Sequence, residues 1–580
     1  MSETAKESLN FIEQIITDDL ETKKNVTVHT RFPPEPNGFL HIGHVKAIAI
    51  NFETAKKFGG KTNLRFDDTN PTTEKTLYVD NIKNDIKWLG YDWEDREYFA
   101  SDYFDQLHAF AVDLIKKGLA YVDESTPEQI AEMKGDPNTP GKNSPFRDRT
   151  IEENLRIFEE MKNGVHPDGS MVLRAKVDMA HPNLLMRDPN IYRIKTATHH
   201  RTGDKWCIYP LYDFAHGQSD SIENITYSLC SLEFRHHRDF YNWLIEKLEI
   251  FPSRQIEFAR MNVAHMITSK RKLLKLVEEN CVTGWDDPRM PTVAGMRRRG
   301  FPAAALRTFV NKVGVAKREN TIELDLLESC VRDELNKTAT RVMGVLNPLK
   351  MVITNYPEGQ VEQMPAENNP EDENSGSRTM PFSRELYIEQ EDFMEDAPKK
   401  FFRLGPGKTV RLKNGFIVSY EDHVKDEAGN VTEVQVKYYP DSRSGSDNSG
   451  IKAKGVLHWV SIAQAVKVEV RDYDKLFTVE SPLADEEKDF MEFFNQDSLT
   501  VMGEVFVEPS LQSAKPGDQF QFMRKGYFCM DQESTEDNLV FNKTVGLKSS
   551  YKPKPKNQNQ NQKGNQNQKS NQNQKGNQKK

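Results

Sequence analysis

The chain has 580 residues, five scattered cysteines and a formal net charge of −9. This length exceeds what one hydrophobic core usually serves, so we expect several domains. Because the cysteines form no CxxC pair and have no nearby histidine spacing, we predict no metal site, no disulfides and a reducing, cytoplasmic location. The opening residues are polar and no apolar run approaches bilayer length, so we expect neither a signal peptide nor a membrane span.

A strand pattern, a proline-rich loop and a helix pattern open the first unit of the chain. Residues 26–32 alternate apolar and polar side chains and predict a strand, whereas residues 33–38 contain three prolines, Asn and Gly and predict a loop. A helix entered from such a loop offers phosphate free N–H groups and a positive dipole end, and Gly43 would let a ligand lie against bare backbone. His41 and His44, at i and i+3, could direct two imidazole N–H donors to a nucleotide's phosphates. The alternative is a helix start whose histidines are satisfied locally, and HxGH alone leaves both interpretations open.

A second strand is predicted within residues 59–71, and it ends in the acidic and turn residues DDTNP. Ligands bind at the carboxyl ends of strands in open α/β sheets, so Asp67 is placed to meet a substrate amine. The alternative is that DDTNP forms an Asx turn that caps the next helix. The two roles are compatible if Asp68 or Thr69 caps the helix and Asp67 stays free to meet the substrate. Residues 74–118 are predicted to be helical, with the end near residues 117–118.

Residues 119–210 mix short strands and helices, and we interpret them as a domain inserted between the halves of a nucleotide-binding fold. The apolar strand that starts at residue 206 is predicted to return to the parallel sheet, with Tyr212 and His216 at its end. Buried Tyr and His are often only satisfied core groups, but a position at a strand end favours a functional role. Cys230 lies in the next segment, where a lone buried cysteine is usually a small hydrophobe.

The remaining patterns change from mixed to helical and then to all-β. Residues 253–277 predict a strand and then a polar loop that carries the basic cluster 269–272, which would usually be a solvated face. Helices are predicted up to about residue 340. Residues 341–545 show short alternating strands with Gly, Pro and Asn-Gly turns, which suggest β-barrels.

The last thirty residues are a low-complexity repeat of Asn, Gln and Lys and are predicted to be disordered. They contain eight lysines and no acid, so residues 1–550 carry −17. If this acidic body binds RNA, it must do so through local basic patches. The tail's lysines add weak, salt-sensitive attraction to RNA, or the tail serves only to solubilise the chain.

PPEPNG followed by LHIGH closely resembles the ATP-binding signature of class I aminoacyl-tRNA synthetases, in the form used by glutaminyl and eukaryotic-type glutamyl members. The TSK sequence at 268–270 resembles the second class I signature, whose lysine stabilises phosphate charge in the transition state, with Thr268 in place of the usual Met. The similarity covers nearly all of residues 25–548. Its segments TRFPPEPNG, LRFDDTNP, PGKNSPFRDR, WCIYPLYDFAH, GWDDPRMPT and RKGYFC occur in the order expected for the glutaminyl subgroup.

The resemblance implies a multidomain α/β plus all-β chain. Its parts are a Rossmann-type nucleotide-binding fold split by an inserted α+β domain, a helical subdomain, two C-terminal β-barrels and a disordered tail. The expected boundaries are a lead-in at 1–24, the first catalytic half at 25–118, an acceptor-end-binding insert at 119–210, the second catalytic half at 211–272, the helical subdomain at 273–340, two anticodon-binding barrels at 341–548 and the tail at 549–580.

The implied reaction is ATP-dependent activation of L-glutamine to glutaminyl adenylate, followed by transfer to the 3′ end of tRNA(Gln). The resemblance implies ATP with Mg²⁺ as cosubstrate, and catalytic roles for His41, His44 and Lys270 on the phosphates. It implies ATP binding by Pro34, Glu35, Pro36, Asn37, Gly38, His41, Gly43, His44, Thr268, Ser269 and Lys270. It implies glutamine binding by Arg31, Asp67, Tyr212, His216, Cys230 and Gln255. It implies tRNA binding by Pro182, Leu184, His236, Arg341, Arg403, Gln521 and Arg524.

Cys230 is the residue that favours glutamine over glutamate. Glutamyl members place a cationic arginine there to pair the substrate carboxylate, whereas a neutral Cys leaves that charge unmatched. A pocket built for an amide can reject the acid by ~10⁴ or more. Two departures from the bacterial pattern affect tRNA contacts: Phe402 replaces a basic residue, and His236 replaces an aspartate that reads a guanine amino group. Basic residues 297–299 could touch the inner arc of a tRNA.

Three other functions compete with glutamine–tRNA ligation. A eukaryotic-type glutamyl enzyme is the nearest, and Cys230 and Gln255 argue against it. A catalytically inactive RNA-binding relative would not need His41, His44 and Lys270 intact. A small-molecule nucleotidyltransferase that shares HxGH would need neither the insert nor the barrels. We expect a monomer, because one chain already holds the catalytic and anticodon modules.

Overall fold

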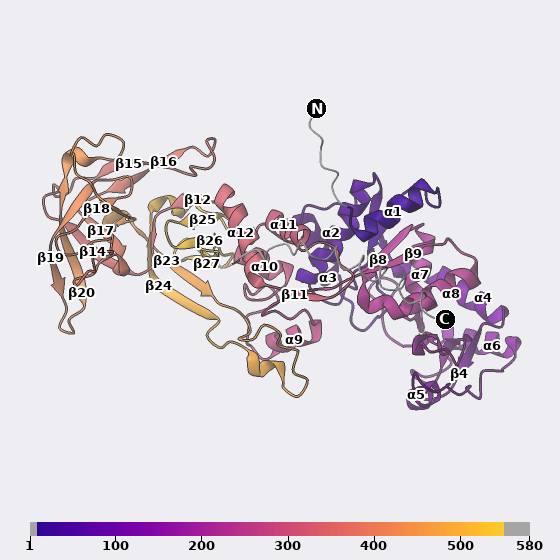
Figure 1. Cartoon of the computed structure of the whole chain (residues 1–580). Helices are drawn as coiled ribbons and strands as arrows, with labels where there is room; N and C mark the ends of the chain where they lie inside the picture. Colours follow the sequence, from indigo (N-terminus) through magenta and orange to yellow (C-terminus); the bar gives the residue numbers. More distant parts are fainter. Residues whose placement is uncertain (1–8, 550, 552–580) are drawn as a thin grey trace, which may run out of the picture.

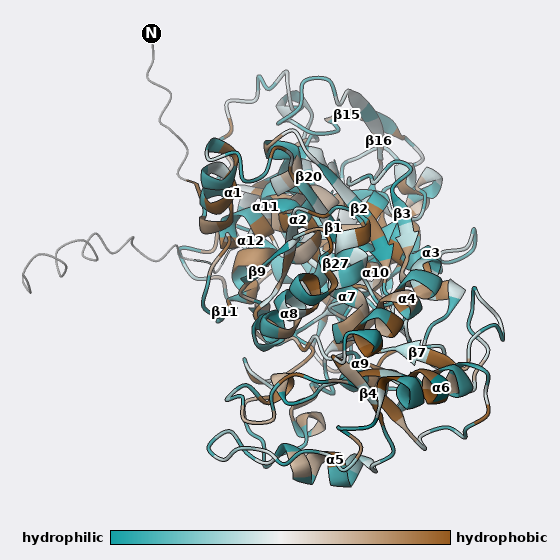
Figure 2. Cartoon of the chain, turned by 90° about the vertical axis from the view of Figure 1, so that its right-hand side faces the viewer, coloured by the Kyte–Doolittle hydropathy of each residue, from teal (hydrophilic) through white to brown (hydrophobic). Residues whose placement is uncertain are grey.

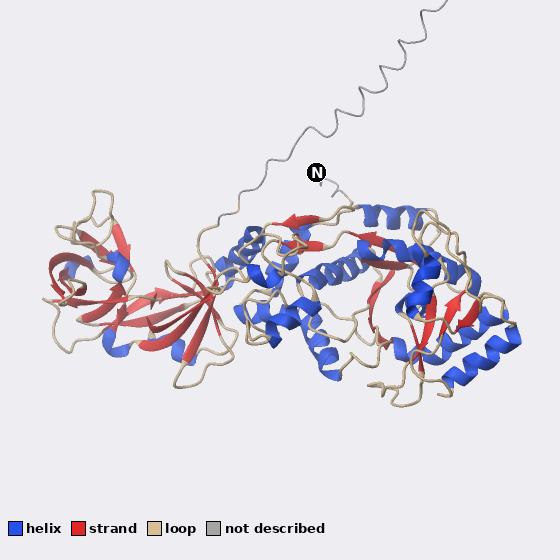
Figure 3. Cartoon of the chain, turned by 90° about the horizontal axis from the view of Figure 1, so that it is seen from below, coloured by secondary structure: helices blue, strands red, loops and turns tan. Residues whose placement is uncertain are grey.

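The computed structural model describes residues 9–549 and 551, so the predicted tail falls almost wholly outside the described residues. The molecule is elongated, with parallel strands and helices at one end and β-sheets at the other (Figure 1). Figure 3 shows the same division by secondary structure. Within the described residues, no helix combines the length and the apolar character that crossing a bilayer requires.

A parallel sheet forms the centre of the α/β part. Its first three strands are parallel in the order β1-β2-β3, and β8 and β9 form a second parallel pair. The Thr226 N–H, just before β8, donates to the His29 carbonyl at 3.0 Å and so joins the two sheets. The elements are β1 (His29–Phe32), α2 (Ile42–Lys57), β2 (Lys61–Phe66), α3 (Thr76–Trp88), β3 (Glu97–Phe99), α4 (Phe104–Lys116), α7 (Tyr212–Ile222), β8 (Tyr227–Ser231), α8 (Arg238–Leu248) and β9 (Arg254–Phe258). This arrangement confirms the predicted Rossmann-type fold, interrupted between β3 and β8.

The two faces of β1 and β2 differ in chemistry because side chains alternate across a strand. Phe32, Leu64 and Phe66 belong to an apolar core that also contains the inner face of α2. Arg31 and Arg65 lie on the other face and are buried as well. The positive charge of these two buried arginines must be neutralised by neighbouring acidic side chains. The helix α7 supplies such side chains.

Two boundaries predicted in this region are wrong. The first strand begins at His29 and not at residue 26, because Val26 is 81% exposed and the pairing with β2 starts at His29. Residues 74–118 are not one helix. Gly90, with φ +87°, follows the end of α3, and β3 then pairs with β2 before α4 begins.

The inserted part, confirmed as α+β, has its own antiparallel sheet, in the order β4-β5-β6-β7, and its own core. Its elements are β4 (Ala120–Asp123), α5 (Pro127–Lys134), α6 (Ile151–Lys162), β5 (Val172–Ala175), β6 (Asn190–Ile194) and β7 (Ile208–Pro210). The strand predicted to return to the parallel sheet is therefore misplaced: β7 pairs with β6, and Tyr212 is the first residue of α7. An apolar strand would fit either sheet, and only its hydrogen-bonded pairing determines which sheet it joins. Near-surface helices such as α4 and α8 show both hydrophilic and hydrophobic sides (Figure 2).

Helices connect the parallel sheet to the C-terminal half. They are α9 (Lys270–Glu278), α10 (Val293–Arg299), α11 (Ala303–Val313) and α12 (Leu324–Thr338), with β10 (Met261–Val263) paired to β11 (Asn320–Ile322), while α1 (Phe11–Glu21) lies in the predicted lead-in. The basic residues 270–272 are not in a loop as predicted, because they form the first turn of α9. Leu273 and Leu276 are buried beneath them and anchor that helix.

Two seven-stranded sheets fill the C-terminal half, which we call the proximal and the distal barrel. The proximal barrel has the order β12-β25-β26-β27-β23-β24-β13 and lies beside α10 to α12, whereas the distal barrel has the order β21-β18-β19-β20-β14-β17-β22 and lies at the far end (Figure 1). In each sheet the two outermost strands are consecutive in the chain. One bent segment, 340–345 in the proximal barrel and 455–461 in the distal one, therefore closes each sheet. This closure removes exposed sheet edges and agrees with the predicted barrels.

The remaining strands lie between residues 340 and 545, and short 3-10 helices are spread along the chain. The strands are β12 (Thr340–Val342), β13 (Gly344–Val345), β14 (Pro348–Ile353), β15 (Glu362–Glu367), β16 (Ser377–Phe382), β17 (Glu385–Glu389), β18 (Thr409–Leu412), β19 (Ile417–Lys425), β20 (Val431–Tyr439), β21 (Gly455–Leu457), β22 (Val460–Ser461), β23 (Val466–Tyr473), β24 (Leu499–Val507), β25 (Gln519–Phe522), β26 (Gly526–Met530) and β27 (Leu539–Val545). The 3-10 helices are η1 (Ala100–Tyr103), η2 (Leu184–Met186), η3 (Leu232–His237), η4 (Gln390–Asp392), η5 (Pro440–Ser442), η6 (Ile462–Gln464), η7 (Phe490–Phe493) and η8 (Pro509–Ser513).

Candidate active site

A cavity of about 550 Å³ opens at the carboxyl ends of the parallel strands. Most of the predicted small-molecule-binding residues line it: Arg31, Pro34, Glu35, His41, Gly43, His44, Asp67, Tyr212, Cys230, Thr268 and Lys270. Six others do not line it: Pro36, Asn37, Gly38, Ser269, His216 and Gln255. The cavity also has basic lining residues that the sequence patterns did not single out, namely Lys46, Arg193 and Arg260.

His41 and His44 cap the start of α2 reciprocally. The Gly43 N–H donates to His41 Nδ1 and the His41 N–H donates to His44 Nδ1, both at 3.1 Å, and the two rings stack with centroids 3.8 Å apart. Burial, reinforced by the nearby Lys270 and Arg260, lowers the pKa of His41 to about 3, and burial with His41 beside it also lowers the pKa of His44. Both rings are therefore neutral, and since each Nδ1 accepts a hydrogen bond, each Nε2 carries the proton. The local-capping alternative and the donor role are thus compatible: one nitrogen caps, and the other remains a donor.

Lys270 lies against the loop that precedes His41. Its Nζ donates to Asn37 Oδ1, and its aliphatic chain passes close to Gly38, where a Cβ would come within 3.3 Å of Lys270 Cδ. Gly38 therefore leaves room for the lysine stem. Burial lowers the pKa of Lys270, and the opposing Glu35 carboxylate limits the change. The ammonium and the histidine donors line one cavity, which makes that part of the cavity suitable for phosphate.

Arg31 forms the buried end of the cavity and is almost fully hydrogen-bonded. Its Nε donates to Asp220 Oδ1 at 2.9 Å, and its two Nη atoms contact the Leu229 carbonyl, Ser228 Oγ and His216 Nε2, each at 2.8 Å. Four of its five N–H groups are thus used within the protein. His216, which stacks on Tyr212 at 4.9 Å, therefore acts behind the cavity wall by holding Arg31.

Asp220 is the centre of a buried ionic network that sequence reasoning missed. Arg31 and Arg65 both pair with it, at 2.9 and 2.7 Å, and Arg65 pairs in addition with Glu223 at 3.0 Å. The Tyr241 hydroxyl donates to the other Asp220 oxygen at 3.0 Å. A signal was present, because Asp220 and Glu223 lie three residues apart and so share one face of a helical segment.

Cys230 and Gln255 lie on the neighbouring strands β8 and β9. The Cys230 thiol lines the cavity, and burial raises its pKa, so the group is neutral. Gln255 is not in the cavity: its Nε2 donates to the Phe234 carbonyl at 3.1 Å and to Glu257 Oε1 at 3.0 Å. It therefore fixes the segment that carries Phe234, itself a cavity residue.

Asp68, His199 and His200 form a cluster that could suggest a metal site, because their ligand atoms lie within 4.8 Å of one another. His199 Nδ1, however, accepts the N–H groups of Arg201 and Thr202, both at 3.2 Å. His199 Nε2 must then carry the proton, and it lies 2.8 Å from the Asp68 carbonyl. A protonated nitrogen cannot ligate a metal, so the cluster serves to join the insert to the loop that carries Asp67.

The predicted tRNA-binding residues form two groups. Near the insert, Asn183, between Pro182 and Leu184, donates to the His236 carbonyl at 2.8 Å and brings these three residues together. At the junction of the barrels, Arg341 and Gln521 are direct neighbours on β12 and β25, and Arg403 and Arg524 both pair with Asp392.

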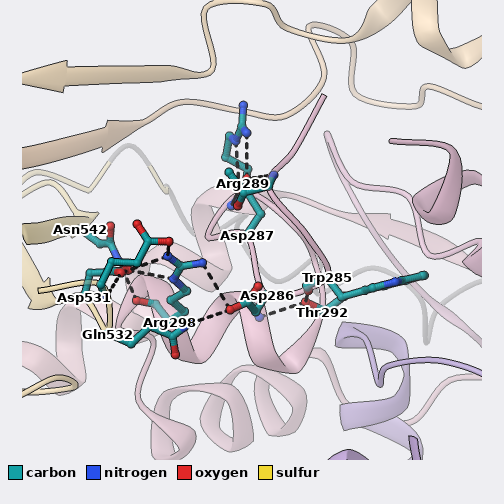
Figure 4. Close-up of polar contacts among 12 residues, drawn as sticks. Trp285, Asp286, Asp287, Arg289, Thr292, Arg298, Asp531, Gln532 and Asn542 are labelled. Carbon is teal, nitrogen blue, oxygen red and sulfur yellow. Dashed lines mark hydrogen bonds and ion pairs between the residues drawn. The ribbon is translucent and has the colours of Figure 1, made fainter. Parts of the chain in front are cut away.

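The arginines at residues 297–299, which were expected to form a basic patch, mostly make ion pairs within the protein. Arg298 binds both oxygens of Asp531, at 2.9 and 3.0 Å, and also Asp286 at 3.3 Å (Figure 4). Arg299 donates to the Tyr473 carbonyl, and Arg297 pairs with Asp85. These arginines fasten α10 to the proximal barrel and to α3, a role that the sequence does not distinguish from a free basic patch.

The segment 285–293 also supports the start of α2. The Ile42 N–H donates to the Pro291 carbonyl and the Val293 N–H donates to the Leu40 carbonyl, both at 2.9 Å. Thr292, shown in Figure 4, pairs with His41 in an isolated β-bridge and caps α10 through its hydroxyl. The backbone at the paired histidines is therefore held from a second domain.

A split parallel sheet, paired histidines at the first crossover helix and a lysine reaching across the same cavity are the features of a class I aminoacyl-tRNA synthetase. The family models agree: "tRNA synthetases class I (E and Q), catalytic domain" matches residues 27–337, and two models for the anti-codon binding domain of that family match residues 339–439 and 456–531. The chain belongs to the E and Q class I tRNA synthetases.

Several relatives cover almost the whole chain. The glutamine–tRNA ligase of Clostridium perfringens is 54% identical over 95% of this chain and 100% of its own length. That of Rhodopirellula baltica is 56% identical over 94% of this chain and 90% of its own length. That of Salmonella heidelberg is 53% identical over 95% of this chain and 99% of its own length.

Proposed function

We propose that this chain acts as a glutamine–tRNA ligase that uses ATP to form glutaminyl adenylate and then esterifies tRNA(Gln), releasing AMP and pyrophosphate. The observation that carries the proposal is the full-length similarity to relatives of that name, in a chain whose cavity holds both class I signatures. We expect it to act as a monomer in the cytoplasm, where its five unpaired thiols would stay reduced.

The phosphate end of the cavity supports the first step. The Nε2–H groups of His41 and His44 and the Lys270 ammonium would hold the ATP phosphates while the glutamine carboxylate attacks the α-phosphorus. These groups stabilise charge that develops on the phosphate oxygens, and their neutral and cationic states need no rearrangement during the reaction. Because both histidines are neutral, Lys270 is the one cation among these three groups. Three neighbouring cations in a buried site would carry a large desolvation cost.

The other end of the cavity supports amino-acid recognition. Asp67 and the Tyr212 hydroxyl would meet the α-ammonium group, and the substrate amide would lie against Cys230 and Arg31. Because Asp220 balances the charge of Arg31 and Cys230 is neutral, neither of these two residues offers an unpaired positive charge to a glutamate carboxylate. This charge balance supports glutamine over the eukaryotic-type glutamyl alternative.

Mg²⁺ would enter with the ATP phosphates. Mg²⁺ prefers a few carboxylate oxygens together with phosphate and water, and Glu35, which lines the cavity near Lys270, is a carboxylate that fits this preference. The ion would neutralise phosphate charge there. The acceptor end of the tRNA would approach along Pro182, Leu184 and His236 and bring its terminal ribose hydroxyl to the adenylate, while the barrels hold the anticodon.

The pH dependence of glutamine use offers a test of the role of Asp67. Burial, opposed by Arg65, raises the pKa of Asp67 to about 7. A protonated carboxyl cannot pair with an ammonium group, so kcat/KM for glutamine should fall below that pH, by about tenfold per unit once protonation dominates. Asp67→Asn should lower kcat/KM and remove this limb of the profile. An unchanged acidic limb in the variant would show that Asp67 does not meet the substrate.

Pyrophosphate exchange into ATP tests the proposed function. With tRNA(Gln) present, glutamine should support exchange and glutamate should not. Members of this family generally need the tRNA for activation, so exchange should vanish when it is omitted. Exchange that prefers glutamate, or that runs fully without tRNA, would overturn the assignment.

A further inference from the structure

The junction between the two barrels contains a buried carboxylate, Asp392, that the proposed reaction does not explain. Asp392 ends η4 in the distal barrel and is 0% exposed. Arg403 approaches it from the same barrel, and Arg524 approaches it from the turn between β25 and β26 of the proximal barrel. One carboxylate thus holds two arginines that come from different domains.

The pairing with Arg524 is bidentate. Arg524 Nη1 donates to Asp392 Oδ2 and Arg524 Nη2 donates to Asp392 Oδ1, both at 2.7 Å. Arg403 Nη1 donates to the same Oδ1 atom. A fork of this kind fixes the plane of a guanidinium group, which a single contact would leave free to turn. Asp392 therefore determines the direction in which Arg524 faces.

The backbone of Arg524 is also unusual. Its φ of +68° lies in the left-handed region, where a residue with a Cβ is disfavoured. Such a conformation persists when contacts hold it, and the Asp392 fork is the strongest contact of this side chain. The turn thus carries some strain at a residue for which the sequence predicts contact with an anticodon base.

A second layer supports the fork. His458 Nδ1 lies 3.2 Å from Arg524 Nη1, and His458 Nε2 lies 3.2 Å from Glu389 Oε1. Since an arginine can only donate, Nδ1 must accept and Nε2 must carry the proton, so a neutral ring satisfies both contacts. Glu389, also fully buried, accepts the N–H groups of Leu346 and Asn347, in the segment that joins the barrels. The carboxylates and the imidazole thus link Arg524 to the interdomain connection.

Both guanidinium groups keep donors for an external ligand. The Arg524 side chain is 27% exposed and that of Arg403 is 37% exposed, whereas Asp392 is completely covered. Arg524 has two N–H groups without a protein partner in the contacts above, and Arg403 has more. Outward-facing guanidinium donors in a fixed plane match the paired acceptors on a base edge or a phosphate.

We propose that Asp392 is a positioning residue for anticodon recognition: it holds Arg403 and Arg524, one from each barrel, in a single composite site, with His458 and Glu389 as its support. This proposal rests on the proposed function, because it assigns the arginines to the anticodon of tRNA(Gln). Asp392 itself is buried and would not touch the RNA. Its removal should affect which anticodon is accepted, and not only how stable the barrels are.

Kinetics on full-length Asp392→Asn test the proposal. The variant keeps the size of the side chain but loses the charge that fixes two guanidinium groups. KM for tRNA(Gln) should rise about 10- to 100-fold, the effect of losing one or two charge-assisted hydrogen bonds, while KM for glutamine and for ATP stays within about twofold. The ratio of kcat/KM between tRNA(Gln) and transcripts with one anticodon base changed should fall. Glu395→Gln removes an exposed carboxylate of the same barrel that pairs with Lys425, and it should leave all these values unchanged.

The outcomes separate this proposal from the proposed function. A wild-type chain that fails to charge tRNA(Gln) with glutamine would refute the function itself. A wild-type chain that charges it, with an Asp392→Asn variant that folds and discriminates anticodons equally well, would overturn only the positioning role. If Asp392→Asn does not fold, His458→Leu and His458→Gln decide instead. The leucine variant should lose discrimination and the glutamine variant, which can still accept and donate, should retain it; equal behaviour of the two would refute the proposal.

Discussion

Replacing Lys270 by alanine should lower kcat for glutamine-dependent pyrophosphate exchange about 100- to 1000-fold, the usual effect of removing one preorganised donor from a charged transition state. The lysine lines the cavity and is bonded to Asn37, in the loop before the paired histidines, so under the proposed function its charge lies where phosphate charge would develop. KM for glutamine should change little, because the proposed function assigns the amino acid to the other end of the cavity. Single-turnover adenylate formation would measure the effect on the chemical step.

Lys272→Ala is the matched control for this variant. Lys272 lies on the same first turn of α9, but its ammonium lies over the Phe490 ring, 5.3 Å from the centroid, and not in the cavity. It should retain kcat within about threefold, since a partly exposed cation–π contact contributes only ~0.5–1 kcal/mol. Equal losses in the two variants, or a Lys270→Ala enzyme within threefold of wild type, would remove Lys270 from the mechanism.

Replacing Asp220 by asparagine should destabilise the catalytic domain by about 3–5 kcal/mol, the usual penalty for breaking a buried ion pair by removing one partner. Arg65 would then keep only Glu223 as a counter-charge, and Arg31 would lose its counter-charge altogether. Although burial raises it, the pKa of Asp220 is held well below its ordinary value by these two arginines. The stabilisation is therefore complete above about pH 4, the ordinary pKa of an unfolded aspartate, and is lost only in stronger acid.

Urea unfolding at neutral pH, followed by tryptophan fluorescence, would measure this loss of stability. Asp213→Asn is the control on the same helix, α7. Asp213 pairs with His237, and both side chains are about 30% exposed, so this change should cost no more than about 1 kcal/mol. A stable Asp220→Asn protein, indistinguishable from the Asp213→Asn protein, would mean that the buried network does not hold the site together.

Local patterns were sufficient to predict the elements that carry the proposed phosphate site. The three prolines, the asparagine and the glycine of residues 33–38 exclude regular structure, and the helix that follows has a continuous apolar face, so the loop before α2 could be predicted without the fold. Apolar residues at helical spacing in this segment, Val45, Ile48, Ala49 and Phe52, are all buried. The direction of the histidine donors could not be predicted, because it depends on which ring nitrogen caps the helix.

The other features depend on pairing between residues that are distant in the chain, which local patterns do not show. Nothing in residues 206–210 tells whether that strand joins the parallel sheet or the insert, and β7 joins the insert because β6 offers the free edge. Asp220 and Asp392 resemble ordinary surface acids in the sequence, since Arg31 and Arg65 lie 189 and 155 residues from Asp220, and Arg524 lies 132 residues from Asp392. The ion pairs of Arg298 likewise depend on Asp531, 233 residues later. A sequence shows which residues are charged, but it does not show which of them form ion pairs with one another.

The most direct test of the central claim is a charging assay of the purified full-length chain on a tRNA(Gln) transcript, with glutamine and glutamate compared at equal concentration. A neutral Cys230 and an Arg31 already paired with Asp220 predict that glutamine is esterified with a kcat/KM at least ~10⁴-fold higher. Glutamate esterified as well as glutamine, or better, would contradict the account.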